Sequence, residues 1–217
     1  MSDLFLSTTS RDIPLVPQRS ALLFVDVQNF CCHPDGAEWA MMSEDEIAEK
    51  KAPFLVRLHN EVLPRMRHLQ NTCRNAGIEV LYTTIESLTR DGRDRSLDYK
   101  ITGFNVPKGS WDGRVVDDIA PDEDEIVLPK TSSSVFVSTT IDYVLRNLGV
   151  QQLVISGVLT DQCVESAIRD ACDHGYLVTQ VTDACATFTD ARHTASLQAI
   201  RGYCREVTVE DIVAELA

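Results

Sequence analysis

The sequence has no apolar run that approaches the ~20 residues needed to cross a bilayer. Its first residues, from Met1 to Leu6, also lack the basic stretch and apolar segment of a signal peptide. From these two absences we expect a cytoplasmic protein that does not bind membranes.

Positive charge is scarce, because 20 lysine and arginine residues stand against 33 aspartate and glutamate residues, for a net charge of −13. A chain of this charge repels the phosphate backbone, which argues against nucleic acid as a partner. No Gly-x-Gly-x-x-Gly follows an apolar strand, and no Walker-type phosphate loop occurs, which disfavours a nucleotide-binding oxidoreductase. We therefore expect the partner to be a small-molecule substrate.

The seven cysteines are odd in number and scattered, without the pairing typical of metal sites. A chain of 217 residues can bury a substantial core without disulfide staples. Most of the cysteines are accordingly expected to be reduced, buried and inert, with at least one candidate for reactivity.

Short apolar or β-branched runs alternate with segments of helical periodicity along the chain, which predicts a single-domain, doubly wound α/β fold. The expected sheet is mainly parallel and six-stranded, with helices on both faces. Residues 20–217 form this domain, and residues 1–19 form an arm that lies over the surface or on a neighbouring subunit. The expected strands lie near residues 21–25, 78–85, 126–128, 152–156, 177–181 and 205–209.

Four helices are expected between these strands. The first runs from Pro53 to Gly77 with a kink at Pro64, after an irregular stretch over residues 27–52. The second has Ser138 as its cap, the third carries Cys163 in its first turn, and the fourth covers residues 190–200. Residues 86–125 show no long periodic segment, so we expect a lid or a subunit contact there.

Asp26, Lys130 and Cys163 each follow the end of a different predicted strand. The carboxyl ends of parallel strands share one edge of the sheet, so these side chains can meet across one crevice. A helix start and a neighbouring ammonium both favour a thiolate, and a carboxylate can accept the thiol proton. Together they predict a cysteine nucleophile at Cys163, although each residue alone is open to a purely structural interpretation.

Three segments around these residues resemble the motif blocks of the isochorismatase-like cysteine hydrolases. They are Val25-Asp26-Val27-Gln28-Asn29, Leu128-Pro129-Lys130 and the block from Gly157 to Ser166, Gly-Val-Leu-Thr-Asp-Gln-Cys-Val-Glu-Ser. The resemblance extends over nearly the whole chain from Ala21 onward, and the third block is its most specific part.

The resemblance implies a catalytic triad of Asp26, Lys130 and Cys163. It also implies a cis peptide between Val158 and Leu159, with the backbone N–H groups of Leu159 and Cys163 forming an oxyanion hole. Family members that cleave a vinyl ether lack the cysteine, whereas members that keep it hydrolyse amide-type C–N bonds.

The nicotinamidase branch binds a metal through an Asp-x-His pair and a further histidine. Here His33, His59 and His68 occupy the corresponding region, and no Asp-x-His occurs, so we expect no metal and no cofactor. The segment Lys108-Gly109-Ser110-Trp111-Asp112 is similar to the ureidoacrylate, biuret and N-carbamoylsarcosine amidohydrolases. The sequence from Thr131 to Phe136 departs from that branch and leaves the substrate open.

We therefore expect a metal-independent cysteine amidohydrolase of small ureido, carbamoyl or carboxamide compounds, assembled as a homo-oligomer, either a dimer or a tetramer. A vinyl-ether hydrolase and a catalytically silent interaction protein on the same fold are the alternatives. Candidate substrate-binding residues are Gln28, Asn29, Phe30, Trp39, Phe136 and Thr160, each of which could equally serve packing or capping.

Overall fold

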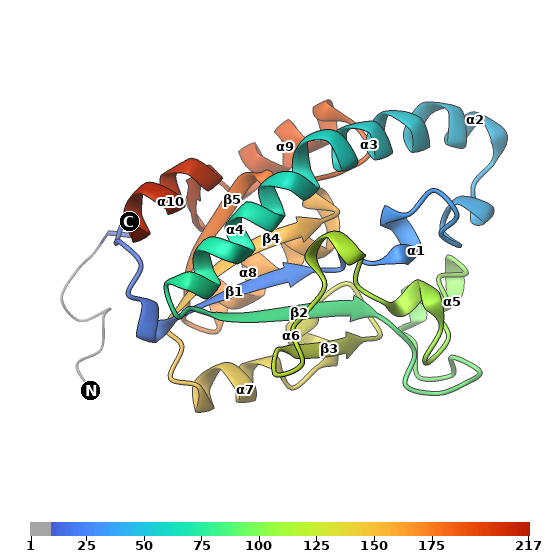
Figure 1. Ribbon diagram of the computed structural model, residues 1–217. Coiled ribbons are helices and arrows are strands. Elements are labelled where there is room, and N and C mark those ends of the chain that lie inside the picture. The colour runs from blue at the N-terminus through green and yellow to red at the C-terminus, as the bar shows by residue number, and fades with distance from the viewer. Residues whose placement is uncertain (1–9) are drawn as a thin grey trace.

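The computed structural model describes residues 10–217, so residues 1–9 of the expected arm lie outside the described residues. It contains a six-stranded sheet of order β3-β2-β1-β4-β5-β6, in which every pair of neighbours is parallel (Figure 1). The strands are β1 (Ser20–Val25), β2 (Glu79–Ile85), β3 (Ile126–Lys130), β4 (Gln152–Val158), β5 (Leu177–Ala186) and β6 (Arg205–Val207). This confirms the predicted parallel α/β architecture.

Side chains of β1 alternate between two hydrophobic layers, as the pleat of a strand requires. Leu22 and Phe24 contribute to the layer covered by α3 (Ala52–Arg57), α4 (Leu63–Asn75) and α10 (Val209–Leu216). Leu23 and Val25 contribute to the layer covered by α6 (Val135–Ser138), α7 (Ile141–Asn147) and α8 (Glu165–Asp173). Because both faces of β1 are buried, its sequence is a nearly continuous apolar run and does not alternate between apolar and polar residues.

The carboxyl ends of the strands are surrounded by short helices (Figure 1). α1 (Asn29–Cys32) follows β1, and α5 (Leu97–Ile101) lies within the long connection between β2 and β3. That connection also contains 3-10 turns at Trp111–Gly113 and Asp117–Ile119. α9 (Asp190–Ile200) lies against the turn that follows β4, as shown by the hydrogen bond from Ser196 Oγ to Thr160 O.

The first long helical region begins earlier than predicted. It starts with α2 (Glu44–Glu46), where Ser43 and Glu46 form a reciprocal capping box. It continues through a π-helical segment at Ile47–Lys51, α3, a second π-helical segment at Leu58–Val62, and α4. Pro53 and Pro64 each occupy the first turn of the α-helix that follows a π-helical segment, so the interruption expected at Pro64 is absorbed by this change of hydrogen bonding.

Two other predicted boundaries are wrong. The helical cap near residue 138 is Ser134, whose side chain accepts from Val137 N, while α7 begins at Ile141. Ser138 Oγ is instead engaged with Ser134 O and Thr131 N. β5 extends to Ala186 because its pairing with β4 resumes after a register shift between Ile155 and Gly157.

Residues 10–19 contact the body of the same chain. Leu15 N donates to Glu215 Oε1, and Val16 N donates to Gln152 Oε1 at 2.7 Å. Across residues 10–217, no helix has the length and apolar character required to cross a membrane.

Candidate active site

Asp26 lies immediately beyond β1, in a left-handed conformation with φ 54°. A non-glycine residue rarely adopts this conformation, and such residues concentrate at functional sites. Asp26 N donates to Thr83 O, and Oδ1 accepts from Thr83 Oγ1, both at 3.0 Å. The carboxylate is thereby fixed at the edge of the sheet with Oδ2 turned to the other functional groups.

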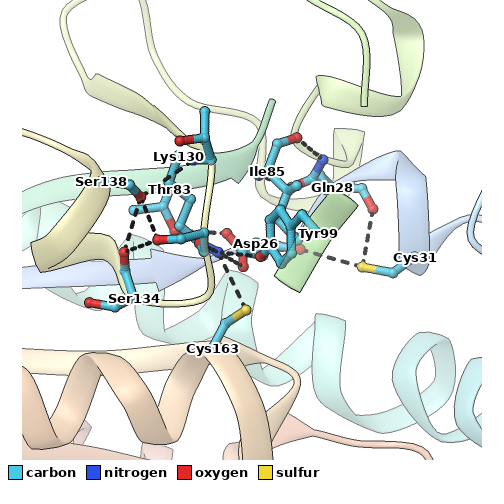
Figure 2. Close-up of polar contacts among 12 residues, drawn as sticks. Asp26, Gln28, Cys31, Thr83, Ile85, Tyr99, Lys130, Ser134, Ser138 and Cys163 are labelled. Carbon is cyan, nitrogen blue, oxygen red and sulfur yellow. Dashed lines mark hydrogen bonds and ion pairs between the residues drawn. The ribbon is translucent and has the colours of Figure 1, made fainter. Parts of the chain in front are cut away.

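Lys130 is the last residue of β3, rather than a residue beyond it, and its side chain is fully buried. Its Nζ lies 2.9 Å from Asp26 Oδ2 and donates to Ser132 O at 2.8 Å (Figure 2). Burial opposes the lysine charge, but the adjacent Asp26 and Cys163 outweigh it and raise the pKa above its usual range. Lys130 is therefore an ammonium held at the centre of the site.

Cys163 completes the group, with its Sγ 3.3 Å from Lys130 Nζ (Figure 2). It lies in a π-helical segment, Thr160–Val164, that precedes α8, so the expected first α-helical turn is a wider one. Burial, reinforced by Asp26 and opposed by Lys130, raises the pKa of the thiol to about 12. This corrects the expectation of a resting thiolate, because full burial disfavours the charged sulfur more than Lys130 favours it.

Gly157 brings the β4 turn against β1. Its φ is 138°, and a Cβ added there would lie 2.2 Å from Val25 O. Only glycine permits this approach. The close contact places the segment that carries Cys163 beside β1, the strand that Asp26 follows. The peptide bond between Val158 and Leu159 is cis.

A cavity of about 320 Å³ opens over these groups, within the range typical of small-molecule sites. Both Asp26 and Cys163 line it, together with Leu159. The remaining lining residues come mainly from α1 and its following loop and from the connection between β2 and β3: Phe30, Cys31, Glu38, Ile85, Asp98, Tyr99, Thr102, Phe104, Ser133, Val158 and Gln162.

Among the predicted substrate-binding residues, Phe30 lines the cavity, where its ring stands edge-on to Phe104. Gln28 does not line it. Its side-chain amide accepts from Ile85 N at 2.6 Å and donates to the carbonyls of Ile85 and Asp112. Gln28 thus joins the end of β2 to the neighbouring connection, and all its groups are occupied.

The other four predicted binding residues also lie outside the cavity lining. Asn29 Nδ2 donates to Trp111 O, and Trp39 Nε1 donates to His33 O. Phe136 stacks on His174, in the layer covered by α8. Thr160 is buried, and its Oγ1 is hydrogen-bonded to His193 Nδ1 at 2.9 Å, so it stabilises the nucleophile turn from behind.

Several cavity residues were not predicted as site residues. One of them, Tyr99, contacts the predicted triad directly, because its hydroxyl oxygen lies 3.4 Å from Lys130 Nζ. It is carried by α5, which begins after the cap Ser96, a residue type that favours a helix start. Glu38 also lines the cavity, and nothing in its local sequence pattern indicates that it is buried. Within residues 10–217, no three histidine, cysteine, aspartate or glutamate side chains are grouped so that they could hold a metal ion.

Comparison with known proteins gives both a family and a fold. A family model described as the isochorismatase domain matches residues 20–211. A cysteine hydrolase from Pseudomonas syringae pv. phaseolicola 1448A is 23% identical, with a TM-score of 0.78 over 94% of this chain and 95% of that chain. An isochorismatase-like hydrolase from Alkaliphilus metalliredigens is 21% identical, with a TM-score of 0.73 over 92% of this chain and 99% of that one.

The N-carbamoylsarcosine amidase of Thermoplasma acidophilum is 25% identical, with a TM-score of 0.67 over 88% of this chain and 97% of that chain. The family match extends over most of the chain and contains Asp26, Lys130 and Cys163. The chain therefore belongs to the isochorismatase family.

Proposed function

We propose that this protein is a metal-independent cysteine amidohydrolase that cleaves a C–N bond of a small ureido, carbamoyl or carboxamide substrate. The observation that carries the proposal is the buried contact of Lys130 Nζ with both Asp26 Oδ2 and Cys163 Sγ at the floor of a cavity. A nucleophile, a proton acceptor and a fixed positive charge are the groups that acyl transfer to sulfur requires.

In the proposed reaction the Cys163 sulfur attacks the substrate carbonyl carbon as its proton moves to Asp26. Because the thiol pKa is raised to about 12, this proton transfer accompanies attack rather than preceding it. The backbone N–H groups of Leu159 and Cys163 stabilise the oxyanion. Asp26 then gives the proton to the nitrogen, the C–N bond breaks, and ammonia or an amine leaves behind a thioester.

Water completes the cycle by attacking the thioester while Asp26 accepts one of its protons. The acyl–sulfur bond breaks, the acid product departs, and Cys163 recovers the proton from Asp26. Lys130 stays charged throughout and stabilises the negative charge that passes between carboxylate and sulfur.

Two further observations support a C–N bond as the target. The structure is similar to that of an N-carbamoylsarcosine amidase. The chain also has a cysteine, Cys163, at the position where family members that cleave a vinyl ether have none. We therefore expect that isochorismate is not hydrolysed, and it serves as the negative control.

The test is steady-state assay of the full chain on a panel of ureides and carboxamides, with isochorismate beside them. We expect turnover of at least one C–N substrate, a loss of more than about 1000-fold in Cys163→Ser, and a mass increase on Cys163 equal to the acyl group after quenching. Cys172→Ser, on α8 outside the cavity, is the matched control and should keep the parental rate. Parental turnover by Cys163→Ser, or hydrolysis of isochorismate alone, would overturn the proposal.

We also propose that residues 20–217 act as one cytoplasmic hydrolase domain that assembles as a dimer or tetramer, with residues 1–19 as an arm. The half-exposed Trp111, in the connection between β2 and β3, is a candidate contact. Light scattering of the full chain and of Trp111→Ser would test the assembly, since a monomeric parent contradicts it.

A further inference from the structure

Glu38 is a buried carboxylic acid in the cavity that contains Cys163, and one of its two carboxyl oxygens has no hydrogen-bond partner among residues 10–217. The residue is 4% exposed, it lines the cavity, and within residues 10–217 its Oε2 atom has no hydrogen-bond partner. Buried carboxyl oxygens are normally paired, so an unpaired one in an active-site cavity points to a partner supplied by the ligand.

The loop that carries Glu38 is built closely onto α1. A Cβ at Gly36 would lie 2.2 Å from Phe30 O and 2.3 Å from Asn29 O, so only glycine allows this approach. Ala37 N donates to Asp112 Oδ1 at 3.0 Å, and Glu38 N donates to Phe30 O at 3.2 Å. The backbone that carries the Glu38 side chain is therefore held in place before any ligand arrives.

The two cations that act electrostatically on Glu38, Lys50 and Arg192, are each paired with another carboxylate. Lys50 Nζ lies 2.8 Å from Glu46 Oε1, and Arg192 is paired with Asp161 at 2.5 Å. Burial raises the pKa of Glu38 to about 8, against the opposing effect of Arg192 and Lys50. Neither cation thus neutralises the carboxylate when it ionises.

Among the described residues that line the cavity, no cationic side chain is available to pair with a negatively charged substituent of a ligand. Of the described residues that line it, three are carboxylic acids, Asp26, Glu38 and Asp98, and none is lysine or arginine. Lys130 lies beneath the floor, paired with Asp26. The aromatic side chains of Phe30, Tyr99 and Phe104 also line the cavity, and aromatic rings both attract cations and pack against apolar stems.

We infer that Glu38 determines substrate specificity by receiving a cationic group, an ammonium or guanidinium, carried by the substrate away from its scissile carbonyl. This inference rests on the proposed function and narrows its substrate class to amino-substituted ureides and amides. Substrates that carry a carboxylate are excluded by the same charge distribution.

Proton linkage gives this assignment a distinctive signature. At pH 7 most of the Glu38 population is protonated, so binding a cation releases a proton, and affinity should rise from pH 6 to 8 and level above. The charged groups that act on Glu38 are Lys50 and Arg192. The other titratable groups of the cavity are Asp26, Cys31, Asp98, Tyr99 and Cys163.

The kinetic test compares three series of mono-substituted ureas. The first bears an ammonium two, three or four carbons from the urea nitrogen, the second replaces that ammonium with a methyl group, and the third replaces it with a carboxylate. We expect the best ammonium compound to exceed its neutral counterpart by about 10- to 100-fold in kcat/KM, the range of a charge-assisted hydrogen bond. Glu38→Gln should remove this preference, so that ammonium and methyl compounds of equal length are hydrolysed with similar kcat/KM.

Asp35→Asn is the matched control, because it removes the same charge from an exposed position in the same loop. It should keep the preference for the ammonium series. A Glu38→Gln melting temperature at or above that of the parent will show that the variant is folded, since the change removes an unpaired buried carboxyl group.

Binding to the inactive Cys163→Ala chain separates this inference from the proposed function. Calorimetry with the best-binding aminoalkylurea, in two buffers of different ionisation enthalpy, should show release of close to one proton at pH 7, and none in Cys163→Ala/Glu38→Gln. Glu38-dependent binding without turnover of any ureide, carbamoyl compound or carboxamide by the parent would overturn the proposed function and leave the cation site standing. Equal turnover or binding of the three series would overturn the cation site and leave the amidohydrolase standing.

Discussion

Lys130 Nζ lies 2.9 Å from Asp26 Oδ2, and both side chains are almost completely removed from solvent. The pair joins an edge strand, β3, to a central strand, β1, across the end of β2. Taking two charges out of water is expensive, and only their mutual attraction and their other hydrogen bonds offset it. The site is therefore also a structural element in which neither charge can be removed alone without a large penalty.

We expect Lys130→Met to abolish activity and to lower the free energy of unfolding by about 3–5 kcal/mol, the usual effect of breaking a buried pair. Asp26→Asn/Lys130→Met should recover much of that stability, because it leaves no unpaired charge, while remaining inactive. Urea denaturation of the parent, Lys130→Met and the double variant measures both the loss and the recovery of stability. Arg93→Met, which breaks an exposed pair with Asp91, should leave the unfolding curve unchanged. A double variant less stable than Lys130→Met would contradict this account.

The reactivity of the Cys163 thiol should follow its raised pKa. Only the thiolate reacts with iodoacetamide, so without substrate the alkylation rate should increase about tenfold per pH unit from pH 7 to pH 10, with no plateau below a pKa of about 12. Peptide mass spectrometry of Cys163 provides the rate, and Cys163→Ala identifies the peptide. A plateau near neutral pH would instead indicate a resting thiolate stabilised by Lys130.

Gly157→Ala should destabilise the fold and disable the site together. The new Cβ would meet Val25 O at 2.2 Å and Val25 N at 2.6 Å, which forces β4 away from β1 and displaces the turn that carries Cys163. We expect a loss of about 2–3 kcal/mol in unfolding free energy, as for other overpacked positions. Gly77→Ala is the control for positive φ alone, because a Cβ at that position would meet no other atom. It should lower the free energy of unfolding by about 1 kcal/mol. Equal losses in the two variants would remove the role assigned to the close approach.

The positions of Asp26, Lys130 and Cys163 could be predicted because they depend on topology. Buried parallel strands are recognised in a sequence as apolar runs, and their carboxyl ends lie at the same edge of the sheet whatever the details of packing. The protonation state of Cys163 could not be predicted in the same way. A helix start and a nearby lysine are visible in sequence, whereas complete burial of the sulfur is a tertiary property.

Side-chain direction explains most of the other differences. Phe136 belongs to a four-residue helix whose phase no periodic pattern reveals, and it turns toward His174 instead of the cavity. Glu38 lies between Ala37 and Trp39 in a segment predicted to be irregular, where no periodic pattern assigns a side chain to the interior. The early helix start was the exception, since Ser43 and Glu46 carry a capping-box pattern that was readable in advance.

Pro129 occupies β3, the outermost strand on its side of the sheet, one residue before Lys130. Lys130 O accepts from Glu86 N, on the β2 side, and successive residues of a strand point their backbone groups to opposite sides. The missing N–H of Pro129 therefore faces outward, where β2 loses no hydrogen bond. An incoming strand from another molecule would find a gap in its row of donors at that point, so the residue preceding the buried lysine also protects this edge against aggregation.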